Sequence, residues 1–259
     1  MLVSLELELP ELEPTSLSRV VGVDVGRRFL AVTTDVGNKT QFFSGSETIH
    51  KANQYQRARK TLQQKGTRSA TRRLKLVSGR ERRFTADINH QISHQIVTPN
   101  TLFDLEDLTH IRERIKPNKK GKKASRKQRK ANRKQTKWSS AKLHSLIDYK
   151  AVLVGSLAIK VDANYTSKGC PKCGHLSDNN RPHKGLTFRC ECCQFELHAD
   201  LVGDRNITLR TILSRQDWER TGALSVRPDV SSVEAKAERL SRYSELRWSS
   251  DTSPRYSEA

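Results

Sequence analysis

Four cysteines and one aspartate, close together in the chain, have the types and the spacing that metal chemistry requires. Cys170-x2-Cys173 is followed by Cys190-x2-Cys193, and Asp200 comes soon after the second pair. Each pair can supply two thiolates from one tight turn, and four thiolates complete a tetrahedral zinc shell. The spacing therefore predicts a structural Zn2+ site in a zinc ribbon. A carboxylate just beyond a rigid metal site can be aimed at a substrate, so Asp200 is the first catalytic candidate, with a helix cap as its alternative role.

Two further acids stand where apolar neighbours would bury them. Asp24 interrupts the apolar run 19–26, and an unpaired charge buried in a strand costs several kcal/mol. A carboxylate hydrogen-bonded in a turn is the alternative there. Glu106 lies in the short run 101–108, flanked by Asp104 and Asp107, and composition alone does not choose among these three.

Asp24, Glu106 and Asp200 lie far apart in the sequence but could meet at one edge of a mixed sheet. Converging carboxylates can hold two Mg2+ or Mn2+ ions, the arrangement that hydrolyses phosphodiesters. The chain has no Ser-His-Asp set, no phosphate-binding Gly-x-x-x-x-Gly-Lys loop and no Gly-x-Gly-x-x-Gly sequence. Acyl transfer, nucleotide hydrolysis and dinucleotide chemistry therefore have no support in the sequence.

The charge of the chain favours an anionic polymer as its partner. The 259 residues include 48 Lys and Arg against 28 Asp and Glu, a formal net charge of +20. Nucleic acid is the usual partner of such a surplus, although ribosomal and membrane-surface proteins share it. A basic helical region covers residues 51–98, and the linker 116–137 is basic without any acid. The residues expected to contact nucleic acid are Arg68, Arg72, Arg73, Arg82, Arg83, Lys119, Lys120, Lys122, Lys123, Arg126 and Lys127.

The pattern of apolar residues and breakers predicts an α/β fold, a mixed sheet flanked by helices. The basic region is expected to form two helices, hinged near residues 65–67 or near residues 78–79. The expected divisions are an acidic leader, 1–18; a core, 19–164; a zinc ribbon, 165–197; a last core helix, 198–214; and a polar, disordered tail, 215–259. No apolar run approaches the ~18 residues of a spanning helix, and the leader has no basic start. A cytoplasmic protein is expected, with Cys192 as a spare thiol.

These residues, with several further motifs, resemble the OrfB/TnpB family of insertion-sequence proteins, which are related to type V CRISPR effectors. The motifs in this chain are Val23–Gly26, Lys65–Ala70, Ser78–Phe84, Asn89–His90, Leu105–Leu108, Asn164–Gly174 and Asp200–Ile207. The resemblance implies an RNase H-like (RuvC-like) nuclease fold with an inserted zinc ribbon. It also implies that Asp24, Glu106 and Asp200 hold the catalytic metal, that the four paired cysteines hold zinc, and that intact members cut DNA directed by a guide RNA. Members are often named transposases, although a separate enzyme performs strand transfer.

The chain departs from the family pattern at several points. Only 23 residues precede Asp24, whereas relatives have a long region there that grips guide RNA, so we expect a shortened copy. The helical stretch before Tyr149 is also shorter. Asp204 replaces a small residue and is either an additional acid near the metals or a surface residue, and Gln194 replaces the usual glycine.

Three functions are compatible with the sequence. The first is a metal-dependent DNA endonuclease. The second is an inactive DNA- or RNA-binding remnant or repressor derived from one, which the shortened regions favour. The third, a ribosome-type basic zinc protein, gives no reason for three acids at these positions. Because all three acids are present, the nuclease is preferred.

Overall fold

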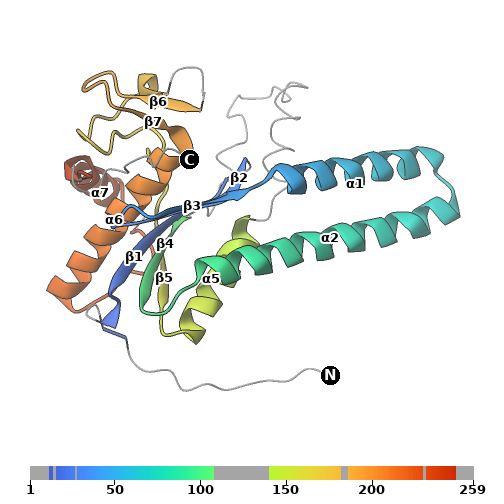
Figure 1. Cartoon of the computed structure of the whole chain (residues 1–259), viewed down its shortest axis with the longest axis horizontal. Helices are drawn as coiled ribbons and strands as arrows, with labels where there is room; N and C mark the ends of the chain where they lie inside the picture. The colour runs from blue at the N-terminus through green and yellow to red at the C-terminus, as the bar shows by residue number, and fades with distance from the viewer. Residues whose placement is uncertain are drawn as a thin grey trace.

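A computed structural model describes residues 12–13, 16–26, 28–107, 140–181, 186–229 and 232–248 of the chain. Its centre is a five-stranded mixed sheet with the order β3-β2-β1-β4-β5 (Figure 1). The strands are β1 (Arg19–Asp24), β2 (Phe29–Asp35), β3 (Thr40–Ser44), β4 (Thr101–Asp107) and β5 (Leu157–Asp162). The first three strands form an antiparallel meander, and β1, β4 and β5 run parallel. The mixed α/β architecture expected from the sequence is present.

The parallel pairing of β1 with β4 decides where their acids lie. Val23 is paired with Leu105, so Asp24 and Glu106, each one residue further, come to the same edge of the sheet. The residues Val20–Val23 before Asp24 include three buried valines, because both faces of the central strands are covered.

Helices cover the two faces differently (Figure 1). On one face, α2 (Arg68–Ile96) and α5 (Ser140–Leu153) bury Phe103 and Leu105 in the main core. On the other face, α6 (Ala199–Thr221) packs along β1, and Leu102 contacts a second cluster that includes Trp218. Adjacent residues of β4 thus point to different cores, as expected for a strand.

The contact between β1 and α6 depends on Gly22. A Cβ atom at this position would lie 2.4 Å from the Thr208 hydroxyl, 2.8 Å from the Thr208 backbone nitrogen and 2.9 Å from the Asp204 carbonyl oxygen. Two of these atoms belong to the backbone and cannot move without displacing α6. The absence of a side chain at residue 22 therefore sets how closely the helix approaches the sheet.

Gly22→Ala is expected to lower the free energy of unfolding by about 2 kcal/mol, because overpacking a tight contact costs about 1–3 kcal/mol. Gly79→Ala is the matched control. Its Cβ would meet only the Arg83 guanidinium at 3.7 Å, and alanine stabilises a helix interior by roughly 0.5–1 kcal/mol relative to glycine. Denaturant melts of both variants test this difference, and a Gly22→Ala protein as stable as the parent would contradict it.

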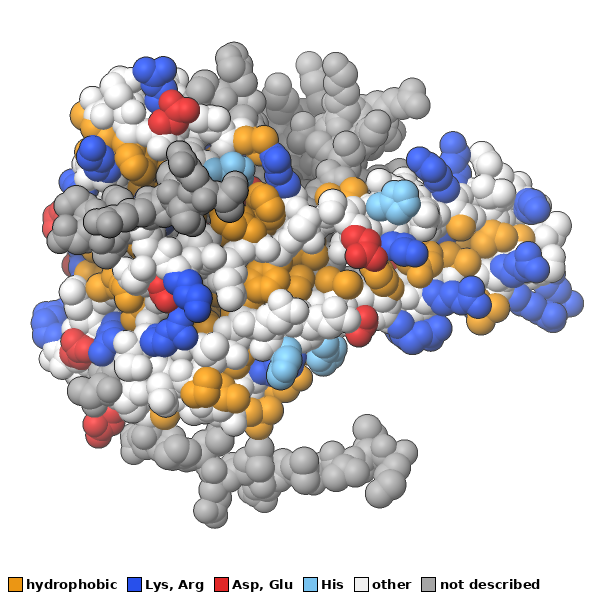
Figure 2. Space-filling model, in the orientation of Figure 1, with side chains coloured by type: hydrophobic (Ala, Val, Ile, Leu, Met, Phe, Trp, Pro, Cys, Tyr) orange, Lys and Arg blue, Asp and Glu red, His pale blue; other side chains and the backbone are white. Residues whose placement is uncertain are grey.

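Two long helices form a hairpin that projects from the sheet (Figure 1). The first helix, α1 (Ser46–Lys65), ends at Gly66, which has a left-handed backbone with φ of 63°. Thr67 then caps α2 by accepting a hydrogen bond from the Ala70 backbone. The hinge is therefore the first of the two predicted sites, and α2 continues without a break through Gly79. Lys and Arg side chains gather toward the outer end of the hairpin (Figure 2).

The segment after residue 214 differs from the disordered tail that we expected. The helix α6 continues to Thr221, and a further helix, α7 (Val233–Glu245), precedes Trp248, which is 8% exposed. Although its sequence is amphipathic, no residue of α7 is itself buried. It is held instead by polar and aromatic contacts. The Tyr243 ring lies 4.1 Å from the Arg210 guanidinium, and the Trp248 backbone N–H donates to the Pro171 carbonyl (2.7 Å).

Several predicted features lie outside the described residues. They include most of the acidic leader and the basic linker, with its candidate nucleic-acid contacts Lys119, Lys120, Lys122, Lys123, Arg126 and Lys127. Among the helices that the structure describes, none combines the length and the apolar character that a bilayer crossing requires.

Candidate functional site

The three candidate acids come from three separate elements that meet at one edge of the sheet. Asp24 ends β1, Glu106 is in β4, and Asp200 is in the first turn of α6. Burial is the main cause that raises the pKa of Asp24 well above its usual value, and the nearby charges of Glu106 and Asp200 raise it further. The Arg181 guanidinium acts in the opposite direction. Such mutual repulsion among carboxylates is what a bound divalent cation would relieve.

The structure also separates Glu106 from the two acids beside it. The Glu106 carboxylate accepts a hydrogen bond from the Thr166 hydroxyl (2.8 Å), which opposes the increase in pKa that burial causes. Asp104 is fully buried deeper under α6 and accepts from the Thr211 hydroxyl (2.8 Å). Asp107 lies on the other face, where its charge acts on His144 of α5. Of these three acids, only Glu106 lies both on the α6 face of the sheet and at the end of the strands where Asp24 lies.

Helix α6 also positions the segment that supports Glu106. The Asn206 side-chain amide donates to the carbonyl oxygens of Thr166 (2.6 Å) and Gly169 (2.9 Å). One turn further, the buried Arg210 donates to the carbonyl oxygens of Asp162 and Asn164. The loop after β5 is therefore tied to the same helix that carries Asp200. This network keeps the Thr166 hydroxyl directed at Glu106.

Arg181 lies near these acids, although nothing in the sequence marks it. It follows a short 3-10 helix, η2 (Asp178–Asn180), in the cysteine-rich segment 165–197, and its positive charge lowers the pKa of Asp24. A chain with 48 Lys and Arg offers no spacing signal that would separate this arginine from the others. Only the folding of the cysteine-rich segment over the sheet edge places it there.

Asp204 is buried beside Asp24, so it is an additional acid near the site and not a surface residue. Its side chain is 0% exposed, and neither carboxylate oxygen makes a hydrogen bond of ordinary geometry, although the Thr34 hydroxyl and the Asp24 backbone are close by. Burial is the main cause that raises its pKa well above the usual value. A carboxyl group in this environment destabilises the fold when it is ionised.

Asp204→Ala is expected to raise the free energy of unfolding at neutral pH by about 1–3 kcal/mol, the cost of a buried polar group without partners. Asp104→Ala is the comparison, since that carboxylate is equally buried but one of its oxygens accepts from Thr211, so its removal should stabilise the protein less than Asp204→Ala does. Thermal melts of the metal-free proteins provide the measurement. A loss of stability in the Asp204→Ala protein would show that this carboxyl group has partners that stabilise it.

The same carboxyl group gives the stability a pH dependence of known sign. Because its pKa is raised in the folded protein, the folded state keeps a proton that the unfolded chain releases above about pH 4. The stabilisation is complete below that pH and is lost as the pH rises through the folded-state pKa. Asp204→Ala should therefore gain more stability at pH 8 than at pH 5, and an equal gain at both would contradict the assignment.

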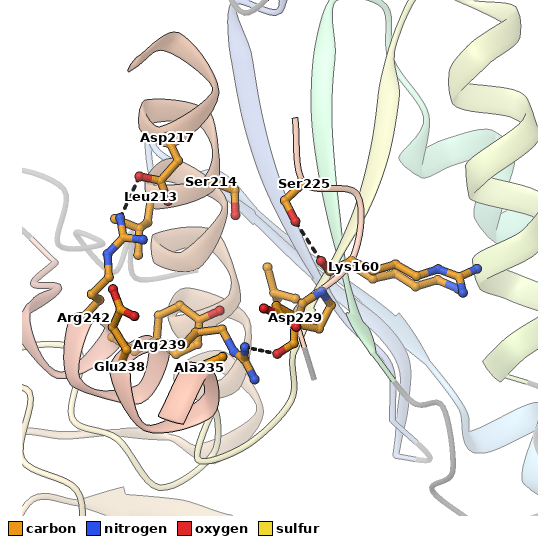
Figure 3. Close-up of a pocket in the computed structure, with 14 residues that line it drawn as sticks. Lys160, Leu213, Ser214, Asp217, Ser225, Asp229, Ala235, Glu238, Arg239 and Arg242 are labelled. Carbon is orange, nitrogen blue, oxygen red and sulfur yellow. Dashed lines mark hydrogen bonds and ion pairs between the residues drawn. The ribbon is translucent and has the colours of Figure 1, made fainter. Parts of the chain in front are cut away.

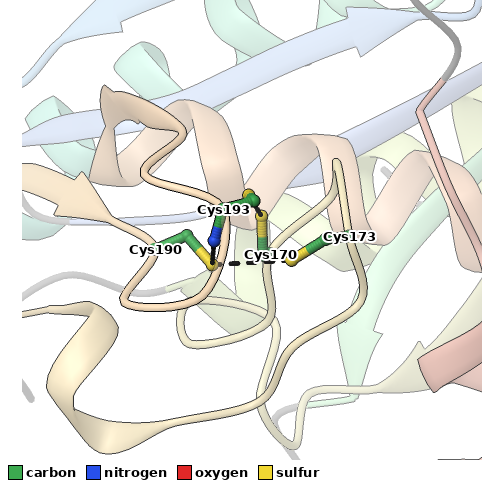
Figure 4. A group of neighbouring side chains, drawn as sticks. All are labelled: Cys170, Cys173, Cys190 and Cys193. Carbon is green, nitrogen blue, oxygen red and sulfur yellow. Dashed lines mark hydrogen bonds between the residues drawn. The ribbon is translucent and has the colours of Figure 1, made fainter.

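The four paired cysteines form a compact cluster (Figure 4). All four sulfurs lie within 4.8 Å of one another, and the Cys170–Cys193 and Cys173–Cys190 distances are 3.6 and 3.5 Å. A tetrahedron with Zn–S bonds of ~2.3 Å requires sulfur separations of ~3.8 Å, which the cluster nearly meets. Among the described residues, no other group brings three potential ligand atoms this close. Four close cysteines could therefore hold a structural metal ion.

The two cysteine turns are joined by polar contacts as well. Asn180 is fully buried, and its amide donates to the Lys168 and His175 carbonyls while its oxygen accepts from the Glu191 backbone. The segment contains a short antiparallel pair, β6 (Thr187–Arg189) and β7 (Glu196–His198). Gln194 has φ of 58°, a conformation that favours glycine, and its side chain offsets this cost by bonding Arg189 and the Glu191 carbonyl.

A separate cavity of about 250 Å3 lies between β5, α6 and α7 (Figure 3). Its charged side chains are mainly paired with one another: Arg242 contacts Asp217 (2.7 Å), and Arg239 contacts Asp162 (3.0 Å) and the Asp229 carbonyl. These contacts attach α7 to the body of the protein. The cavity is therefore explained as an interface between elements.

Comparisons with known proteins agree with this arrangement. A family model described as a probable transposase of the OrfB family matches residues 3–112, and a model described as the Cas12f1-like TNB domain matches residues 141–207. The chain is similar to the CRISPR-associated endodeoxyribonuclease Cas12f1 of Sulfoacidibacillus thermotolerans, with 30% identity over 134 residues, covering 50% of this chain and 28% of that protein. It is also similar to the putative RNA-guided DNA endonuclease InsQ of Escherichia coli, with 37% identity over 59 residues, covering 23% of this chain and 14% of that protein.

A solved structure shows the same fold. The match is to a Cas12f1 protein in a complex with sgRNA and target DNA, with a TM-score of 0.57 and 21% identity, covering 79% of this chain and 52% of that chain. The chain thus matches about half of that protein and less than a third of the curated relatives. The family models match in the order that the motifs predict, and they confirm that this chain resembles the OrfB/TnpB family of probable transposases.

Proposed function

We propose that the chain is a RuvC-like DNA endonuclease of a transposable element, which hydrolyses phosphodiesters with two Mg2+ or Mn2+ ions. The observation that supports this most directly is the meeting of Asp24, Glu106 and Asp200, in which the first carboxylate interacts electrostatically with the other two. Three carboxylates at one end of the sheet would suit a pair of such ions, since oxygen ligands are the ones that Mg2+ and Mn2+ prefer.

The protein's own residues would act by holding and aligning groups. Asp24, Glu106 and Asp200 would bind the two cations, which when bound lower the pKa of water and stabilise the leaving oxygen. The Thr166 hydroxyl fixes the orientation of Glu106. Arg181, whose positive charge reaches Asp24, is placed to attract the scissile phosphate.

The cysteine cluster would hold Zn2+ with a structural role in this proposal. Four protein ligands leave no open position for a substrate, which is typical of structural zinc sites. The zinc would keep the two cysteine turns together, and with them Arg181 and the loop that contains Thr166. Zinc thereby supports the catalytic edge without taking part in the reaction.

DNA is the proposed substrate, and RNA is the proposed guide or second partner. The relatives are named as endodeoxyribonucleases or RNA-guided endonucleases, and the solved relative is bound to sgRNA and target DNA. In this chain the hairpin of α1 and α2 presents the exposed Arg68, Arg72 and Arg73 near its tip. Together with Arg82 and Arg83, these residues form a basic surface suited to phosphate contacts.

The experiment that tests this function is cleavage of labelled single- and double-stranded DNA by the purified chain, with Mg2+, with Mn2+ or with EDTA. RNA that copurifies is left in one sample and digested in another. Cleavage that requires the metal supports the nuclease, and cleavage only in the undigested sample supports guidance by RNA. Tight binding without cleavage under every condition would refute the nuclease.

Substitution of Arg72 and Arg73 by glutamine is expected to weaken nucleic-acid binding and to reduce its salt dependence. Each lost phosphate contact lowers the slope of log K against log salt by about 1. Lys39→Gln is the matched control, because this lysine is exposed in the β2–β3 turn at the opposite edge of the sheet from the acids. Fluorescence anisotropy over a salt series gives both slopes, and equal slopes in all proteins would exclude the hairpin from the interface.

An inactive nucleic-acid-binding protein derived from the family is the second candidate. The observation that favours it is Asp204, a buried acid next to Asp24. An extra negative charge there would alter the affinity for the metals. If Asp204→Ala gained cleavage that the parent lacks, this second candidate would describe the natural protein.

A further inference from the structure

Three aromatic rings lie beside the candidate acids Asp24, Glu106 and Asp200, on the side away from α7. Phe29 and Phe42 have ring centroids 5.0 Å apart, and the His198 ring lies 5.9 Å from the first and 6.5 Å from the second, edge-on to both. Phe42 is 47% exposed, although aromatic rings are usually covered. We call these three side chains the aromatic platform.

The backbone directs two of these rings away from the hydrophobic core. In the edge strand β3, Phe43 packs against the core under α2, so its neighbour Phe42 points to the opposite face. The pairing of β2 with β3 shifts register between Phe29 and Ala31, a bulge that re-aims the Phe29 side chain. The fold thus places two phenylalanines on the α6 face of the sheet, in β2 and in the outermost strand β3, where solvent can reach them.

The aromatic platform is directly connected to the catalytic edge. The Nδ1 atom of His198 accepts a hydrogen bond from the backbone N–H of Asp200 (3.3 Å), so the same histidine caps α6 and contacts both phenylalanines. Hydrophobic side chains are exposed between the cysteine-rich segment and the base of the hairpin (Figure 2). A strand that crosses from the acids toward α1 would pass over these rings.

The surroundings of the platform are positively charged and open. The Arg28 guanidinium lies 5.8 Å from the Phe29 ring centroid. These two residues line a cavity of about 570 Å3 together with Ser44, Ser46 and Ile49, and none of the described residues that line it is acidic. Exposed aromatic faces beside an arginine suit nucleobases joined by phosphates, since a base can stack on a ring while the guanidinium neutralises the backbone.

We propose that the aromatic platform stacks a nucleobase of single-stranded DNA as the strand passes the catalytic acids. This inference deepens the proposed function, because the strand held there would be the one that is cut. Stacking would be tolerant of sequence, since every base has a flat face. A protein segment would cover apolar rings equally well, but the net charge of +20 and the adjoining arginine favour a polyanion.

Phe42→Ala and Phe42→Leu test the inference in the full chain without added Mg2+ or Mn2+, so that no cleavage is needed and the proposed zinc is not removed. The control is Tyr149→Ala, since Tyr149 is 45% exposed and lies on α5, which covers the other face of the sheet. The probes are an oligothymidylate with one 5-iodouracil, for photocrosslinking, and the same strand with an abasic site. Raised salt weakens the phosphate contacts of the other basic surfaces.

Both Phe42 variants are expected to lose about tenfold in affinity for the intact strand, within the range reported for one stacked base. The Tyr149→Ala protein should bind as the parent does, and the abasic strand should bind parent and Phe42 variants alike. Crosslinks should map to the tryptic peptides 29–39 and 40–51. The leucine variant keeps the apolar contact area, so unchanged melting of that variant separates loss of stacking from loss of folding.

Equal affinities in all proteins, or crosslinks confined to other peptides, would overturn the inference. Self-association of the chain that depends on Phe42, without crosslinking, would overturn it in favour of a protein occupant. Cleavage is measured separately with Mg2+. If the parent binds DNA through Phe42 but does not cleave it, the stacking proposal is supported and the nuclease proposal is refuted. If cleavage depends on Asp24 and DNA binding does not depend on Phe42, the nuclease proposal is supported and the stacking proposal is refuted.

Discussion

Replacement of Asp24 by asparagine is expected to abolish metal-dependent DNA cleavage while leaving the protein folded and able to bind DNA. Asp24 is the carboxylate whose charge interacts with both Glu106 and Asp200, so its loss would remove one of the three residues that would hold the proposed cations. Metal ions supply several kcal/mol of transition-state stabilisation, and a loss of this size lowers the rate at least about 10^3-fold. Gel-based cleavage with Mg2+ and with Mn2+ measures this effect.

The same variant is expected to be more stable than the parent when metal is absent. Burial and the two neighbouring acids raise the pKa of Asp24, which means that its charge is costly in the metal-free fold. Asparagine removes the charge and keeps the shape. Higher thermal stability without added Mg2+ or Mn2+, together with lost cleavage, would separate a catalytic role from a structural one.

Asp107→Asn is the matched control for this experiment. Asp107 is the residue next to Glu106, but it lies on the α5 face of the sheet, where its charge acts on His144. Its substitution should leave cleavage within about twofold of the parent, since its charge acts on the α5 face, away from Asp24. Equal cleavage by the Asp24→Asn and parent proteins would refute the three-acid site, and equal loss in both variants would show that the site is not confined to one face.

Loss of zinc from the cysteine cluster is expected to have the second large effect. The parent should copurify with about one zinc per chain, and Cys170→Ser should remove the metal and lower the melting temperature strongly. Zinc binding in small modules contributes on the order of 10 kcal/mol to folding, so the cysteine-rich segment should unfold without it. Metal analysis and thermal melts provide the two measurements.

Cleavage should fall in the Cys170→Ser protein for a reason that the structure makes explicit. The segment that carries the cysteines also carries Thr166, whose hydroxyl bonds Glu106, and Arg181, whose charge reaches Asp24. Cys192→Ser is the matched control, because this thiol is exposed and stands outside the four-sulfur cluster. If the parent contained no zinc and melted at the same temperature as the Cys170→Ser protein, the structural role of zinc would be contradicted.

Much of the core could be predicted from the sequence because local patterns were strong. The apolar runs around Asp24 and Glu106 predicted β1 and β4 close to their observed bounds, and the strand after residue 156 was predicted equally well. The hinge at Gly66 followed from a residue that tolerates a left-handed backbone. The cysteine spacing predicted a cluster that four sulfurs indeed form.

The tail was predicted wrongly because its stabilisation is not local. Helix α7 is amphipathic in sequence, but none of its residues is buried, so its apolar side contributes little to the core. Its position depends on Tyr243 stacking on Arg210 and on Trp248 bonding Pro171, contacts between residues far apart in the chain. Such contacts have no signal in composition or spacing.

The sequence by itself determined which residue types could do chemistry: the paired cysteines, the acids in apolar runs and the excess of basic residues. Only the tertiary structure decided which acids share a site. It separates Glu106 from Asp107 through the alternation of β4 and from Asp104 through the deeper burial of that carboxylate under α6, and it places Arg181 and the buried Asp204 beside Asp24. The physical reason is that spacing along the chain controls local geometry, whereas the electrostatics of the site depend on which segments the packing of α6 against β1 brings together.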